Sequence, residues 1–117
     1  MGTKLLPRQV YQMCVFGGLL VGSAAKFILD DTSEPPNDWD VLVPLSKWQT
    51  VALLIPQDAK PNKFGGWRFT LDNGEDVDLW PDSVENYLRN CKTTRGGRVM
   101  ALDFINNRLF SSEFVDI

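Results

Sequence analysis

The chain has 117 residues, of which 44% are hydrophobic and 23% are charged, and its formal net charge is −3. This length fits one domain, residues 1–117, that buries roughly two thirds of its unfolded surface, and the composition excludes an intrinsically disordered chain. The negative charge gives no overall attraction to nucleic acid, and the absence of histidine removes the usual zinc ligand and the usual base near neutral pH.

The cysteines and an apolar N-terminal segment bear on the compartment. Cys14 and Cys91 lie far apart in apolar contexts, so we expect buried free thiols in a reducing compartment, which indicates a cytoplasmic protein. The segment 10–29 is apolar, but polar residues and three glycines interrupt it. We therefore expect neither a membrane span nor a signal peptide, and no membrane partner.

In the first half of the chain, helical and strand patterns alternate. Pro7 suits the first turn of a helix, and the apolar residues after it recur at helical spacing until Gly17-Gly18. A buried strand at 19–21 and the start of a helix at 24–29 are predicted next, followed by a loop at 30–37. After a strand at 39–43, Ser46 is the predicted cap of a helix that ends before Pro56.

The second half is predicted to be rich in hairpins. After a loop at 57–63, a strand at 67–71 leads into Asn73-Gly74, a strong turn signal, and a return strand at 75–80. Asp82 and Glu85 resemble a capping box for a helix through Cys91, and a polar loop follows at 93–97. Strands at 98–104 and 108–114, turned at Asn106-Asn107, complete the chain. These elements predict an α+β domain in which about three helices flank a mixed or antiparallel sheet.

Two aspartate pairs are the most informative feature of the sequence. Asp38 and Asp40 belong to one predicted strand, and Asp76 and Asp78 belong to another. Because alternate side chains of a strand share a face, the members of each pair point the same way and lie roughly 7 Å apart. Such carboxylates repel one another, and a bound divalent cation would remove the repulsion. We expect both strands in one sheet with the pairs side by side; the simpler alternative is the solvated face of two amphipathic strands.

The order of these motifs resembles the nucleotidyltransferase superfamily of the polymerase-beta type. In that family a hydrophobic strand leads to Gly-Gly or Gly-Ser and a helix, as at Gly22-Ser23. An acid-x-acid motif follows on a neighbouring strand, as at Asp38 and Asp40, and a third acid comes from a later strand. The resemblance covers residues 19 to about 91 and implies a minimal single-domain form similar to the catalytic core of CCA-adding and poly(A) polymerase enzymes.

The resemblance implies metal-dependent transfer of a nucleoside monophosphate from a nucleoside triphosphate to a hydroxyl group, with release of pyrophosphate. The acceptor is RNA, such as a tRNA 3′ end, or a partner protein. Two Mg²⁺ or Mn²⁺ ions about 3.5–4 Å apart serve such a displacement by neutralising its developing charge. The implied catalytic and metal-binding residues are Asp38, Asp40 and Asp78, of which Asp78 also serves the incoming hydroxyl; Asp76 competes with it for the role of third acid.

The resemblance assigns nucleotide binding to Gly22, Ser23 and Lys26. Small residues at a strand-to-helix turn let backbone N–H groups approach phosphate oxygens, and Lys26 would reach the triphosphate. The alternatives are an ordinary turn with Ser23 as helix cap and a solvated lysine, and Gly17-Gly18 is a rival for the glycine turn. A basic loop at 95–98 is also suited to phosphate or RNA.

Other functions stay open. Small members of the superfamily act in toxin–antitoxin pairs, so the main alternative is a non-catalytic, antitoxin-like interaction protein that keeps the fold and binds a toxin-like partner or forms a homodimer. A metal-dependent nuclease is a weaker alternative, because it leaves the glycine turn unexplained. The tryptophans are predicted to be core or half-buried sheet residues, one of which is available to stack on a base: Trp39, Trp48, Trp67 and Trp80.

Overall fold

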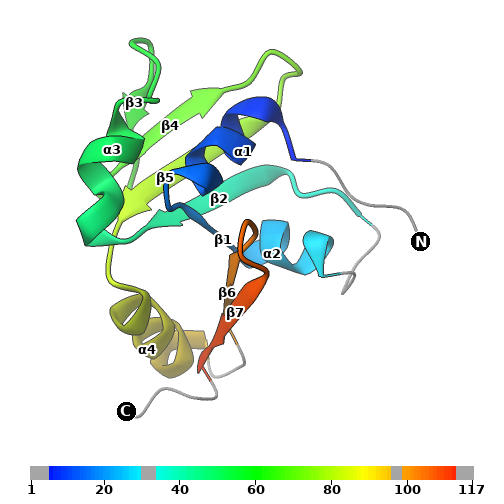
Figure 1. Cartoon of the computed structure of the whole chain (residues 1–117), viewed down its shortest axis with the longest axis vertical. Helices are drawn as coiled ribbons and strands as arrows, with labels where there is room; N and C mark the ends of the chain where they lie inside the picture. The colour runs from blue at the N-terminus through cyan, green and yellow to red at the C-terminus, as the bar shows by residue number, and fades with distance from the viewer. Residues whose placement is uncertain (1–5, 30–33, 96–98, 113–117) are drawn as a thin grey trace.

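The structure is a computed structural model of the chain that describes residues 6–29, 34–95 and 99–112 (Figure 1). Within these ranges, seven strands form one mixed sheet in the order β3-β4-β5-β2-β1-β6-β7. The strands are β1 (Leu19–Val21), β2 (Asp38–Val43), β3 (Lys60–Pro61), β4 (Trp67–Thr70), β5 (Asp76–Pro81), β6 (Met100–Asp103) and β7 (Arg108–Ser111). The helices of the described residues are α1 (Arg8–Val15), α2 (Gly22–Ile28), the 3₁₀-helix η1 (Leu45–Lys47), α3 (Trp48–Ala52) and α4 (Val84–Arg95).

The α+β class and the mixed sheet are confirmed, but the prediction of about three helices is wrong, because the described residues form four α-helices. The sheet also gains β3 inside the segment predicted as a loop. Lys60 and Pro61 pair there with Arg68 and Trp67 at the edge of the sheet, where a proline is tolerated because one side of the strand needs no partner. The predicted residues 30–33, 96–98 and 113–114 lie outside the described part of the chain.

Two predicted helix caps are also wrong. The hydroxyl of Ser83, not the carboxylate of Asp82, accepts the backbone N–H of Asn86, at 3.0 Å, in the first turn of α4. Asp82 instead accepts from the side chain of Asn86 at 3.0 Å. Ser46 lies within η1, and no side chain caps α3. The helices still form in these places because their apolar residues pack onto the sheet, which outweighs one capping bond.

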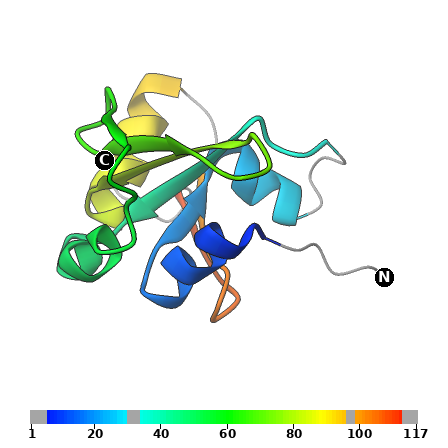
Figure 2. The ribbon, with the colours of Figure 1, turned by 90° about the horizontal axis from the view of Figure 1, so that it is seen from above.

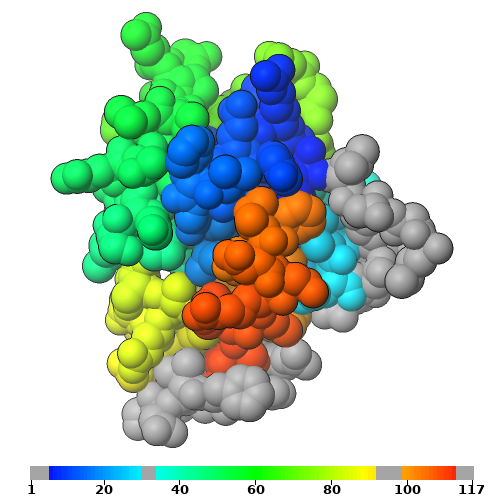
Figure 3. Space-filling model, viewed as in Figure 1, coloured from blue at the N-terminus to red at the C-terminus, as the bar shows by residue number. Residues whose placement is uncertain are grey.

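One face of the sheet carries the main hydrophobic core. Helices α1, α2 and α3 lie on this face, opposite α4 (Figure 2). Trp39, Val41 and Val43 of β2 and Val77 and Leu79 of β5 point into this core. The space-filling view shows α1 beside the β6–β7 hairpin (Figure 3), and there the ring of Tyr11 packs edge-on against that of Phe104, with centroids 6.2 Å apart.

The opposite face of the sheet is divided between α4 and the aspartates. Leu42 and Trp80, near the ends of β2 and β5, belong to a second apolar cluster against which Tyr87 of α4 packs. Since side chains alternate along a strand, Asp40 shares a face with Leu42, and Asp78 shares a face with Trp80. We call this surface, with its four aspartates at the start of β2 and β5, the aspartate face.

Both cysteines are buried and free, as predicted. Burial, followed by the negative charge of Asp103, raises the pKa of the Cys14 thiol to about 12. This thiol is therefore protonated at neutral pH. No helix in the described ranges is long and apolar enough to cross a membrane.

Candidate functional site at the aspartate face

The parallel pairing of β2 with β5 aligns the two aspartate pairs. Asp38 is the Cα partner of Asp76, and Asp40 is the Cα partner of Asp78. Neighbouring strands lie about 4.8 Å apart, so the four carboxylates share one small area of the sheet. Asp78 is only 4% exposed, so its carboxylate is buried. The structure therefore brings together all the acids that the sequence singled out.

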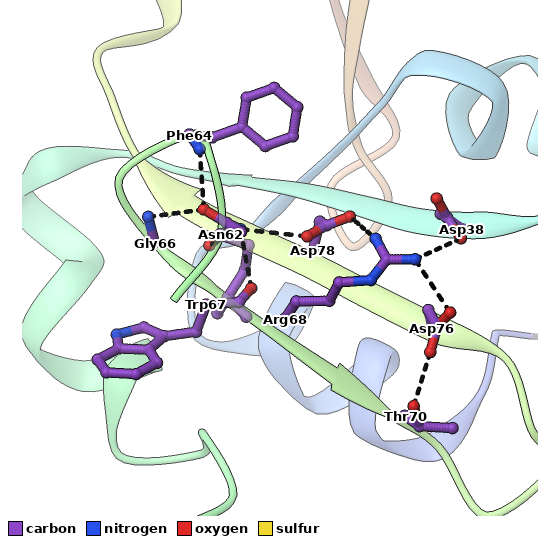
Figure 4. Close-up of polar contacts among 10 residues, drawn as sticks. Asp38, Asn62, Phe64, Gly66, Trp67, Arg68, Thr70, Asp76 and Asp78 are labelled. Carbon is purple, nitrogen blue, oxygen red and sulfur yellow. Dashed lines mark hydrogen bonds and ion pairs between the residues drawn. The ribbon is translucent and has the colours of Figure 1, made fainter. Parts of the chain in front are cut away.

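An arginine that the sequence analysis did not single out lies among these carboxylates (Figure 4). Arg68 of β4 is the Cα partner of Asp78, and its Nη1 donates a hydrogen bond to Asp78 Oδ2. Its Nη2 donates to Asp76 Oδ2 at 3.0 Å and to Asp38 Oδ1 at 3.2 Å. The guanidinium thus supplies an internal positive charge that reduces the repulsion among the aspartates.

The same contacts shift the pKa values of the groups that make them. The hydroxyl of Thr70 donates to Asp76 Oδ1 at 2.7 Å, and this hydrogen bond, followed by the charge of Arg68, lowers the pKa of Asp76 below its usual 3.8. Burial alone would lower the pKa of Arg68, but the hydrogen bond to Asp38 and the charges of the aspartates raise it. Asp76 and Arg68 are therefore both ionised at neutral pH.

Asn62, just after β3, connects Asp78 to the turn between β3 and β4. Its Nδ2 donates to Asp78 Oδ1 at 3.2 Å and to the carbonyl oxygen of Trp67 at 3.0 Å. Its Oδ1 accepts the backbone N–H groups of Phe64 at 3.0 Å and Gly66 at 2.9 Å. One side chain thus fixes both the orientation of the buried carboxylate and the path of this turn.

The predicted glycine turn lies beside the aspartates. Val21, the last residue of β1, is the Cα partner of Asp40. Gly22 follows with a φ of +62°, and a Cβ there would stand 3.2 Å from Asp40 Oδ2. Both the backbone conformation and this close approach favour glycine. The rival turn lies elsewhere, because Gly18 approaches Val41 on the core side of the sheet.

Ser23 and Lys26 are both exposed on α2. Ser23 is exposed in the first turn of α2, and no side chain caps this helix, so the alternative in which Ser23 acts as its cap is wrong. Lys26 is exposed in the last turn of α2 and does not belong to the lining of the cleft beside Gly22. The structure thus places Gly22, rather than Lys26, against the aspartates.

A cleft of about 330 Å³ lies between the aspartate face and α4. Gly22 and Asp40 line it together with the aromatic side chains of Phe64, Trp80 and Tyr87. The ring centroid of Trp80 lies 4.8 Å from that of Phe64 and 6.1 Å from that of Tyr87. Trp80 is 8% exposed, so its ring is mostly buried between its neighbours. The cleft therefore joins acidic groups at Asp40 to an aromatic wall.

The aspartates fit a hard divalent cation in chemistry but are not preassembled as a cage. Within the described residues, no group of three His, Cys, Asp or Glu side chains is arranged to hold a metal ion. Mg²⁺, however, is usually bound by one or two carboxylates together with waters and substrate phosphates. Asp40 and Asp78, adjacent on neighbouring strands, provide such a pair. The chemistry of this pair is thus compatible with a divalent cation whose other ligands come from outside the described residues.

Comparisons with protein families, with curated proteins and with solved structures found no match to this chain.

Proposed function

We propose that the chain is a metal-dependent nucleotidyltransferase that moves a nucleoside monophosphate from a nucleoside triphosphate to a hydroxyl group of RNA or of a partner protein. The observation that carries the proposal is the register of three strands: Asp40 lies between Val21 of β1 and Asp78 of β5. This register puts a glycine turn and two carboxylates from separate strands in one place. Their order along the chain is that of the nucleotidyltransferase fold that the sequence resembles.

In the proposed reaction the acceptor oxygen attacks the α-phosphorus of the triphosphate. A bond forms between them, and the bond from the α-phosphorus to the oxygen that bridges to the β-phosphorus breaks. Pyrophosphate leaves with that electron pair. Asp78 accepts the proton of the acceptor hydroxyl, directly or through water. Asp40 and Asp78 would hold Mg²⁺ or Mn²⁺, which supplies charge neutralisation when bound, and Asp38, the third acid that the resemblance implies, would have to turn toward the ion from its pairing with Arg68. Gly22 and Ser23 would present backbone N–H groups to the phosphates; Lys26, in the last turn of α2, lies outside the cleft and would have to reach the triphosphate from there.

Arg68 must change partners for this chemistry to occur. Its Nη1 donates a hydrogen bond to Oδ2 of Asp78, and the proposed reaction needs this carboxylate. Arginine binds phosphate in a bidentate manner, as it does carboxylate, so the oxygen atoms of a bound triphosphate would compete with the three aspartates for the guanidinium. Arg68 would therefore move from Asp78 to the phosphates as the substrate binds. Its side chain is 40% exposed, which leaves it room to do so.

Arg68 also favours a second candidate function, a non-catalytic or antitoxin-like interaction protein. An unpartnered cluster of carboxylates would destabilise the fold, so its presence would argue for a bound metal ion. Because Arg68 pairs with Asp38, Asp76 and Asp78, the cluster is compatible with folding without one. In this case the aspartate face would serve the fold and the partner would bind independently of it.

The test is a screen of the purified protein with α-labelled ATP, GTP, CTP and UTP, each with Mg²⁺ or Mn²⁺ and with RNA or cell protein as acceptor. Nucleotidyl transfer predicts label on an acceptor from at least one triphosphate, and loss of that label in Asp40→Asn. The interaction protein predicts no label from any triphosphate and a partner that is captured equally by the wild type and by Asp40→Asn. That second result would refute the proposed reaction.

A further inference from the structure

The aromatic wall of the cleft has no role in the chemistry proposed above. Phe64, Trp80 and Tyr87 come from separate elements, the β3–β4 turn, β5 and α4, yet they line the same cavity. Phe64 is 45% exposed, although an aromatic ring of that size gains free energy from burial. A ligand that covers this ring beside Gly22 and Asp40 would gain that free energy on binding.

We propose that this cleft binds the base of a nucleotide, stacked against the aromatic wall, with its phosphates directed to Gly22 and Asp40. This inference rests on the proposed function and specifies where its substrate binds. A volume of about 330 Å³ falls within the range of small-ligand sites. Each base has an aromatic face, so stacking on such side chains binds bases of any sequence.

The electrostatics of the cleft suit a ligand with one apolar and one charged end. Gly22 and Asp40 line the end of the cleft that adjoins the aspartate face, and the phosphates and their counter-ions would lie there. Lys63 does not line the cleft, but its Nζ lies 5.3 Å from the centroid of the Phe64 ring and adds a positive charge beside that ring. Asp40 and Asp82 both line the cleft, and a ligand that is apolar throughout would bury their carboxylates further without forming a hydrogen bond to them.

The wall is held in place before a ligand arrives. Asn62 Oδ1 accepts the N–H group of Phe64 and so fixes the turn that carries this ring. The same Asn62 donates to Asp78. The base-binding wall and the carboxylate of the proposed reaction therefore share one positioning residue, which would keep the base and the reactive phosphate at a fixed separation.

The test compares ligands that contain a base with one that does not. The probes are ATP, GTP, CTP and UTP, their monophosphates, and inorganic tripolyphosphate, titrated by calorimetry with Mg²⁺ into the wild type, Phe64→Ala and Phe16→Ala. Phe16 is the matched control, since it is also 45% exposed but does not line this cleft. We expect at least one triphosphate to bind more tightly than tripolyphosphate. Phe64→Ala should weaken nucleotide binding by about 5- to 150-fold, the range that one stacked base contributes.

Phe64→Ala should bind tripolyphosphate as tightly as the wild type does, because this probe has no base. Phe16→Ala should bind every probe as the wild type does. Phe64→Tyr keeps an aromatic ring and should therefore retain the nucleotide affinity that Phe64→Ala loses. Equal affinities for nucleotides and tripolyphosphate, or nucleotide binding that Phe64→Ala leaves unchanged, would overturn the base site but not the proposed reaction. Binding of monophosphates that depends on Phe64, without label transfer in the screen above, would support the base site and refute the reaction. Binding of no probe would overturn both.

Discussion

Arg68 and Asp78 lie directly opposite each other on β4 and β5, and the guanidinium of the first donates to the carboxylate of the second. This pair determines how the aspartate face is stabilised. Asp78 is buried, and a buried carboxylate without a partner is costly. The arginine supplies that partner in the protein alone, so any cation or substrate that uses Asp78 must compete with Arg68.

Arg68→Met is therefore expected to destabilise the fold. The variant loses charged hydrogen bonds and leaves neighbouring carboxylates without this cation, for which we expect a loss of about 1.5–3 kcal/mol in the free energy of unfolding. Urea unfolding at pH 7 measures it. Arg89→Met is the matched control, because that side chain is 41% exposed against 40% for Arg68 and its ion pair with Glu85 lies along one helix. A helix pair contributes about 0.3–0.5 kcal/mol. Equal losses in the two variants would show that the cluster does not depend on Arg68.

Thr70→Val is expected to raise the pKa of Asp76, because it removes the hydrogen bond that lowers this pKa. A carboxyl group with a lowered folded pKa stabilises the protein above its unfolded pKa, and this stabilisation is lost as the pH falls through the folded value. The wild type should therefore exceed Thr70→Val in stability at pH 6, and the difference should shrink below about pH 3.8. NMR titration of the Asp76 carboxyl carbon, with Thr50→Val as control, measures the shift; an unchanged pKa would contradict it.

Asn62→Ala is expected to loosen the turn between β3 and β4 and the orientation of Asp78 together. The change leaves the N–H groups of Phe64 and Gly66 without their acceptor. We expect a loss of about 1–3 kcal/mol in urea unfolding. Asn106→Ala removes an exposed hydrogen bond to Asp103 and should cost less than about 1 kcal/mol. A loss in Asn62→Ala no larger than in Asn106→Ala would mean that the turn holds its path without this side chain.

Metal and nucleotide together should stabilise the protein against heat. A ligand that binds only the folded state at 100 times its Kd contributes about 2.7 kcal/mol. For a chain of this size that corresponds to a rise in Tm of roughly 10 °C, with Mg²⁺ and a non-hydrolysable triphosphate. Asp40→Asn should lose most of this rise in Tm. The control is Asp58→Asn, which should keep the rise because Asp58 is exposed in the loop before β3. Identical shifts in both variants would place the ligand away from the aspartate face.

The aspartate face was predictable from the sequence because its pattern is local. In β2 and β5, aspartates alternate with apolar residues, and a period of two determines which side chains share a face. Trp39, between the first two aspartates, is buried on the core side as this alternation requires. The glycine turn was predictable for the same reason, since it directly follows the apolar strand β1.

The place of Arg68 was not predictable, because it depends on the register of one hairpin. A two-residue turn at Asn73-Gly74 would pair Arg68 with Leu79 and turn the arginine toward the core. In the structure the loop contains one residue more, Gly74 has a φ of +88°, and Arg68 pairs with Asp78. A shift of one residue moves every side chain of a strand to the other face.

Asn62 was missed for a related reason. Its Oδ1 accepts from the nearby turn, but its Nδ2 donates to groups of β4 and β5, and the bond to Asp78 spans 16 residues, a separation that no local pattern marks. The aromatic wall likewise depends on the way α4 packs across the end of the sheet, where Tyr87 contacts Trp80. Long-range packing of this kind becomes visible only in the folded structure.

The most direct test of the proposed reaction is the rate of pyrophosphate release from a triphosphate, measured with Mg²⁺ or Mn²⁺ in the wild type, Asp78→Asn and Asp76→Asn. Asp78 lies beside Asp40, whereas Asp76 lies two residues earlier, at the start of β5 beside Asp38, and accepts a hydrogen bond from Thr70. We expect release by the wild type, a rate loss of about 10³-fold or more in Asp78→Asn, and a loss below about tenfold in Asp76→Asn. No release from any triphosphate, or equal rates in the wild type and Asp78→Asn, would contradict the account.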